Sequence, residues 1–194
     1  EFDALALAYL DAHPSQHFSL RWLGAQLADF IDGYLIPAQA APLSELARLE
    51  WAFTLAFDAV DAAPLSLTQM AELPAEDWPT LQVRLLPSVQ WLACRHNSLA
   101  IWRAGKEQGD FPGSLPLVTT ETCVVWRDQL ITRYRCLAAD EATALQGMAV
   151  QGWSFAELCG ELAYLGEQAP AQAVSWLRQW LADGLLQRAD HLSR

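Results

Sequence analysis

The stretch of sequence that decides the fold is Thr122–Leu137, TCVVWRDQLITRYRCL. Two runs rich in β-branched and aromatic residues, 122–127 and 130–137, are separated by Asp128 and Gln129. This pattern is typical of a β-hairpin. Because glutamine adopts a positive φ less readily than the glycine or asparagine of tight hairpin turns, we expect the turn to be longer than two residues.

Three short helices are predicted directly after the hairpin, over residues 139–150, 154–165 and 170–183. Ser154 and Glu157 have the spacing of a capping box at the start of the second helix. Pro170 suits the first position of the third helix, and Gly184 suits the position after its end. A strand pair combined with three short helices is typical of a winged-helix domain.

The N-terminal half is predicted to be mainly helical, because apolar residues such as Leu46, Leu49 and Phe53 recur at helical spacing. Prolines interrupt this pattern after His13 and between Pro37 and Pro42. The helices expected there span residues 2–12, 19–31 and 42–62. Further along, alternating apolar residues predict two short strands at 81–85 and 89–91, or one bent strand across both segments. A short helix is expected at 97–104.

Closely spaced glycines and prolines at residues 105–116 predict a linker. The expected organisation is a helical domain over 1–104 and a winged-helix domain over 117–194, which together make an α+β protein. Because the chain begins with Glu1 and its first residues have the pattern of a helix interior, we expect the N-terminal domain to be truncated at its start.

Composition excludes several classes of function. The chain has 194 residues with 12 basic and 23 acidic side chains, a formal net charge of −11. Such a molecule repels a phosphate backbone, so general nucleic-acid binding is not expected. No apolar run is long enough to cross a bilayer, so we expect a cytoplasmic protein with no membrane partner. The spacing of the four cysteines matches neither a disulfide framework nor a CxxC pair, which predicts reduced and mostly buried thiols.

The sequence contains no catalytic signature and no closed set of metal ligands. Asp11, His13 and His17 are close in sequence, but Pro14 interrupts any helix that would align the histidines, so a polar loop is the favoured interpretation. Cys94 and His96 supply only two ligands. We therefore expect no enzyme activity, no catalytic residues, no cofactor and no metal.

Arginines gather on the hairpin, where Arg127, Arg133 and Arg135 face a single acid, Asp128. Strand alternation places Ile131, Arg133 and Arg135 on one face. A sheet edge flanked by arginines suits an extended acidic peptide that adds as another strand. An ordinary exposed hairpin with solvated arginines explains the same residues equally well.

The last predicted helix carries Trp176 and Trp180 one turn apart, beside an inward stripe that includes Leu177. This pair could form a groove wall or additional core. The helix has a single basic residue, Arg178, which disfavours insertion into a DNA groove.

The chain resembles a known protein family in several short motifs. The motifs that carry the resemblance are SLRWL (19–23), LARLEWAF (46–53), AFDA (56–59), LPAEDW (73–78), LLPSV (85–89) and LAIWRA (99–104). They are similar to those of the HvfC/BufC family, whose members carry an older label of putative DNA-binding protein. The part from about Leu117, ending in ADGLL (182–186), is similar to PqqD-like peptide-recognition domains.

The resemblance implies a role in maturing ribosomally made, post-translationally modified peptides. The chain would be a non-catalytic adaptor that binds the leader of a precursor peptide and forms a heterodimer with a multinuclear non-heme iron oxidase, which holds the metal. The rival interpretations are a DNA-binding transcription regulator and, more weakly, a stand-alone iron-dependent enzyme.

In PqqD-like domains the leader lies as an added strand between the last strand of the sheet and the third helix. By this resemblance the groove walls are the segments 131–137 and 173–180. The peptide-binding residues expected on them are Ile131, Thr132, Arg133, Tyr134, Arg135, Ala173, Trp176, Leu177 and Trp180.

Overall fold

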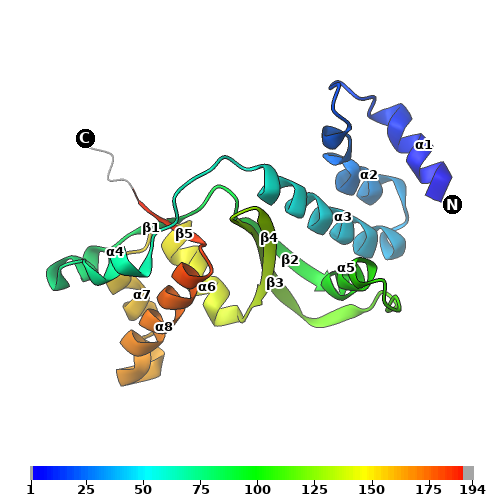
Figure 1. The fold of residues 1–194 in the computed structure, drawn as a ribbon. Coiled ribbons are helices and arrows are strands. Elements are labelled where there is room, and N and C mark those ends of the chain that lie inside the picture. The colour runs from blue at the N-terminus through cyan, green and yellow to red at the C-terminus, as the bar shows by residue number, and fades with distance from the viewer. Residues whose placement is uncertain (1, 190–194) are drawn as a thin grey trace. The chain divides into compact units, whose positions relative to one another are not determined.

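The structure is a computed structural model that describes residues 2–189, and it combines helices with strands, which confirms the predicted α+β class (Figure 1). The described residues divide into two compact units. The first contains residues 2–54 and 92–121, and the second contains 55–91 and 122–189. The chain therefore passes between the units three times, whereas the expected organisation has one linker at 105–116.

The first unit is mainly helical. Its helices are α1 (Phe2–Ala12), the 3₁₀ helix η1 (Leu20–Gly24), α2 (Leu27–Tyr34), most of α3 (Pro37–Asp58) and α5 (Ser98–Glu107). The helix predicted at 2–12 is confirmed, and α5 confirms the helix expected at 97–104. The single helix predicted at 19–31 is wrong, because η1 and α2 are two separate helices.

Helix α3 begins at Pro37, five residues before the predicted start, and Pro42 lies inside it. Proline suits a first helical position, which explains the start at Pro37. Pro42 lacks the N–H group that would bond to the carbonyl of Ala38, but Ala38 is exposed, so that carbonyl is open to solvent. Among residues 2–189, no helix combines the length and the apolar character needed to cross a bilayer.

The predicted hairpin is confirmed as strands β3 (Pro116–Asp128) and β4 (Ile131–Leu137), which pair antiparallel. With β2 (Gln90–His96) they form a sheet in the order β2-β3-β4. The longer turn expected from the sequence is wrong, because Asp128 pairs with Ile131 and the loop is Gln129 and Leu130. Gln129 accepts a left-handed φ of 55° there, since the strand ladder on either side fixes the turn.

We expect Gln129→Gly to stabilise the protein by about 0.5 kcal/mol. Glycine removes the free-energy cost of the left-handed φ, which is roughly 1 kcal/mol. Glycine also raises the conformational entropy of the unfolded chain, and this offsets about half of the gain. Urea unfolding would measure the change. Leu130→Gly is the matched control, because Leu130 is equally exposed and its φ is not positive, so that change should destabilise. Equal losses in both variants would contradict the assignment of strain to Gln129.

The second unit holds the three helices predicted after the hairpin. They are α6 (Ala139–Ala149), α7 (Phe155–Glu161) and α8 (Ala169–Ala182). The capping box of Ser154 and Glu157 is present at the start of α7. The predicted helix 154–165 is too long, because α7 gives way to the 3₁₀ helix η3 (Ala163–Gln168), in which Gly166 has a φ of 59°.

Three short elements of the second unit were not predicted, although Ser66 and Gln69 form a capping box at the start of the first of them. They are α4 (Leu67–Ala71), η2 (Ala75–Thr80) and β5 (Leu186–Arg188). β5 pairs antiparallel with β1 (Val83–Leu85), which confirms the strand predicted at 81–85. The partner of β1 was not predicted.

The core of the second unit is built where α6, α7 and α8 pack against one another and against β1 (Figure 1). Val124, Trp126 and Leu137 contribute to it from one face of the β3–β4 hairpin. The largest fully buried side chains of this core are Trp180, Leu145, Met148, Leu158, Leu177, Leu185, Leu186, Val83 and Val124. The helices thereby hold one face of the hairpin firmly in place.

Candidate functional site

Strand β4 is the last strand of the sheet order β2-β3-β4, so its far side is a sheet edge. The two-residue loop requires Asp128 and Ile131 to be the hydrogen-bonded pair that closes the hairpin. Pairs then alternate along the strands, and Arg133 and Arg135 also direct their main-chain groups toward β3. The main-chain groups of the residues between them, beginning with Thr132, face the edge.

The side chains of β4 alternate as the sequence predicts. Arg135 lies opposite Val124 and Arg133 opposite Trp126, on the face that packs on the core of the second unit. Tyr134 lies opposite Val125 on the other face. Along the strand, Ile131 and Arg133 are exposed, whereas Thr132, Tyr134 and Arg135 are half-buried.

Two of the three hairpin arginines pair with acids of the second unit. The guanidinium of Arg127 donates to Asp61 at 2.6 Å and to the main-chain carbonyl of Phe57. Arg133 donates to Asp128 at 3.0 Å. Asp61 is fully exposed and the Arg133–Asp128 pair is about half exposed, so both are surface pairs that contribute little to stability.

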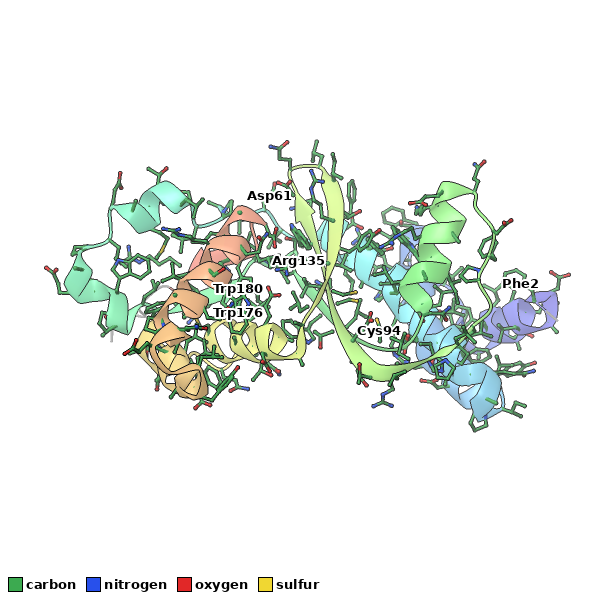
Figure 2. All side chains as sticks on the ribbon, turned by 90° about the horizontal axis from the view of Figure 1, so that it is seen from below. Phe2, Asp61, Cys94, Arg135, Trp176 and Trp180 are labelled. Atoms are coloured by element: carbon green, nitrogen blue, oxygen red, sulfur yellow. The ribbon has the colours of Figure 1, made fainter. Side chains whose placement is uncertain are left out.

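The third arginine, Arg135, belongs to a more buried network that ties β4 to α6 and α8. Figure 2 labels Arg135 and Trp180, two members of this network. Arg135 donates to both carboxylate oxygens of Glu141, at 2.8 and 3.0 Å, and to Asp183 at 3.1 Å. The indole Nε1 of Trp180 donates to Glu141 at 3.0 Å. Burial alone would lower the pKa of Arg135, but its bonds to Glu141 and Asp183 outweigh this effect and raise the pKa.

This pairing bears on the kind of ligand that the hairpin can hold. Arg127, Arg133 and Arg135 each already contact at least one carboxylate of the same unit. An acidic guest would have to compete with those carboxylates. Arg135 therefore acts mainly as an internal tie, and Arg127 and Arg133 are already paired at the surface. Main-chain groups are what the edge offers to a guest.

On α8 the structure separates the four predicted wall residues. Ala173, Leu177 and Trp180 are buried in the core, with Trp180 at 0% exposure. Trp176 is half-buried and stacks on Trp180 with ring centroids 6.5 Å apart. Of these four residues, Trp176 is the one with accessible surface. Trp180 is a core residue that donates to Glu141, and it does not form an open wall of a groove.

A surface cavity of about 460 Å³ lies elsewhere in the second unit. Its walls include the apolar Leu65, Met70 and Leu73 together with Asp77 and Arg188. None of the predicted peptide-binding residues lines it. Sequence reasoning missed this cavity because Arg188 reaches it through the β1–β5 pairing, which links distant segments.

His96, one of the residues considered as a metal ligand, lies beside Glu45 of α3 in the first unit. Glu45 of α3 accepts hydrogen bonds from the main-chain N–H groups of Arg95 and His96, at 2.6 and 3.0 Å, and from the hydroxyl of Ser98 at 2.6 Å. Its carboxylate also lies 3.4 Å from Nδ1 of His96. Glu45 therefore holds the start of α5 in place, a role that no local sequence motif predicts. Cys94 is buried nearby in β2.

His13 and His17 lie against aromatic rings. The ring of His13 lies 5.0 Å from that of Tyr9 and 5.7 Å from that of Phe30. The ring of His17 lies 6.1 Å from that of Trp22. Both histidines lie in the segment between α1 and η1, outside any helix, which agrees with the interpretation of a polar loop.

The predicted thiols differ in burial. Cys94 and Cys123 are buried, whereas Cys136 and Cys159 are half-buried. Burial raises the pKa of the Cys159 thiol. The comparisons with known proteins add no constraint, because no family model matches the chain and no curated protein matches it.

Proposed function

We propose that this chain is a non-catalytic adaptor that binds an extended precursor peptide along β4. The observation that supports the proposal most is the position of β4 at the end of the sheet order, with the main-chain groups of Thr132 facing the edge. An extended peptide adds to such an edge through main-chain hydrogen bonds. Trp176 on α8 offers an aromatic surface for a side chain of the guest.

The proposed role in the cell follows from the family resemblance. The second unit would act as a PqqD-like, winged-helix module that holds the leader of the peptide. The remainder of the peptide would then be modified by a multinuclear non-heme iron oxidase bound to the same chain. Tethering in this way raises the effective concentration of the peptide at the oxidase.

The rival function, transcription regulation through DNA, has weaker support. The net charge of −11 opposes phosphate binding, and α8 carries one basic residue, Arg178. The arginines of the hairpin already contact carboxylates.

Proline substitution separates guest binding from folding. Thr132→Pro removes an N–H that faces the edge, so the β3–β4 ladder stays intact and the melting temperature should change little. Arg133→Pro removes an N–H directed at β3, so this variant should be destabilised strongly. Thr132→Pro should nevertheless lose peptide affinity by roughly tenfold or more, since a hydrogen bond to the guest is lost.

The binding probe is a set of synthetic peptides selected from a random display library on the wild-type protein. Fluorescence anisotropy measures their affinity, and Thr132→Ala serves as the control that keeps the N–H and should keep binding. Affinity should fall only slightly between low and high salt, because the contacts are main-chain bonds. Unchanged affinity in a folded Thr132→Pro variant would contradict binding at this edge.

A further inference from the structure

Cys123 and Cys136 face each other across the β3–β4 hairpin. Counting from the closing pair of Asp128 and Ile131, they occupy a pair without mutual main-chain hydrogen bonds. In such pairs the Cα atoms are about 4.5 Å apart and the side chains approach closely. The two Sγ atoms lie within 4.8 Å of each other.

This geometry meets the requirements of a disulfide. Disulfides join residues whose Cα atoms are roughly 4.4–6.8 Å apart, and the pair type of Cys123 and Cys136 falls in that range. Rotation about the side-chain bonds is therefore enough to bring the sulfur atoms to bonding distance. The strand register need not change.

The two thiols differ in access in a way that suits a stepwise reaction. Cys136 is half-buried and can meet a small oxidant, whereas Cys123 has 0% exposure and meets mainly its neighbour. The other thiols are less suited, because Cys94 is 2% exposed and burial raises the pKa of Cys159, which disfavours its reactive thiolate.

We propose that Cys123 and Cys136 form a reversible disulfide when the protein meets a peroxide. The thiolate of Cys136 attacks one peroxide oxygen, the O–O bond breaks, and a sulfenic acid and hydroxide form. The hydroxide takes up the proton that the Cys136 thiol released on ionisation and becomes water. The thiol of Cys123 then attacks the sulfenic sulfur, so that an S–S bond forms and a second water leaves. In total, two thiols lose two electrons and two protons to one hydrogen peroxide.

The cross-link would connect β3 and β4 near the start of α6. It constrains the unfolded chain, so the oxidised protein should melt at a higher temperature than the reduced protein. The inference does not depend on peptide binding, because it rests on the register of the hairpin and on the sulfur positions alone.

The test treats the whole purified chain with a small molar excess of hydrogen peroxide, then unfolds it in denaturant and blocks the remaining thiols with N-ethylmaleimide, because Cys94 and Cys123 are buried in the folded chain. Intact mass should show loss of two alkylation sites, and digestion without reductant should yield a peptide pair linked through Cys123 and Cys136. Dithiothreitol should restore both sites.

Three variants make the result specific. Cys136→Ala should abolish the cross-link, and Cys123→Ala should leave a sulfenic acid on Cys136 that dimedone labels. A variant with Cys94 and Cys159 both changed to alanine should cross-link as the wild type does. Melting curves check that each variant is folded. Overoxidation of Cys136 while Cys123 remains alkylated, or a linkage through Cys159, would overturn the proposal.

Discussion

Gly147→Ala should destabilise the protein by about 3 kcal/mol, because the added methyl group overpacks a filled site. A Cβ on Gly147 would stand 2.0 Å from the ring of Trp153, far inside the closest real contacts. The ring cannot move away easily, since Trp153 packs on the core and its main-chain N–H donates to the carbonyl of Gly147 at 2.9 Å. In a chain of this size the change corresponds to a melting temperature about 6–12 °C lower.

Two further variants isolate the cause of this loss. Gly160→Ala changes a glycine of α7 with no atom near its would-be Cβ, so it should raise stability by about 0.5–1 kcal/mol through helix propensity. In a Trp153→Ala background, Gly147→Ala should cost nothing further, because the clash is gone. A full loss in that background would show that the ring of Trp153 is not responsible.

Glu141→Ala should destabilise the protein by about 2–3 kcal/mol. Glu141 has 7% exposure, and its carboxylate holds the guanidinium of Arg135 and the indole N–H of Trp180. Its removal leaves a half-buried cation and a fully buried donor without that acceptor, and groups of this kind are costly to leave unpaired. The expected loss of stability is smaller than for a fully buried ion pair, because Arg135 keeps its contact with Asp183 and is partly exposed to solvent.

Asp140→Ala is the matched control for this second change. Asp140 is the neighbouring acid on α6, exposed and bonded to the hydroxyl of Tyr164 at 3.1 Å, so its loss should cost less than about 0.5 kcal/mol. Arg133→Ala should be similarly mild, whereas Arg135→Ala should approach Glu141→Ala. Equal effects of Arg133→Ala and Arg135→Ala in urea unfolding would contradict a special role for the Glu141 network.

The sequence predicted elements whose signals are local. α1 follows from an uninterrupted apolar spacing, α7 from the capping box of Ser154 and Glu157, and the hairpin from two β-rich runs. β5 escaped prediction because three residues carry no periodicity, and only their pairing with β1 defines them as a strand. The Pro42 position was misjudged because an exposed carbonyl tolerates the loss of its donor.

The same distinction explains what could be predicted of the candidate site. Alternation along β4 correctly placed Arg133 and Arg135 on one face. Arg135 also donates to Asp183, which lies 48 positions away in the sequence. This contact could not be predicted, because it depends on where the fold places the end of α8. The burial of Trp180 likewise depends on Glu141, which supplies an acceptor for its indole N–H inside the core.

The pairing of β1 with β5 has a consequence for synthesis on the ribosome. Val83 pairs with Arg188, so β1 leaves the ribosome well before its partner has been translated. At bacterial and eukaryotic elongation rates of about 5–20 residues per second, that delay is roughly 5–20 s. During this interval the second unit lacks its β1–β5 pair, and the main-chain groups of β1 are exposed to other nascent chains and to chaperones. Completion of this unit therefore waits until Leu186–Arg188 has emerged.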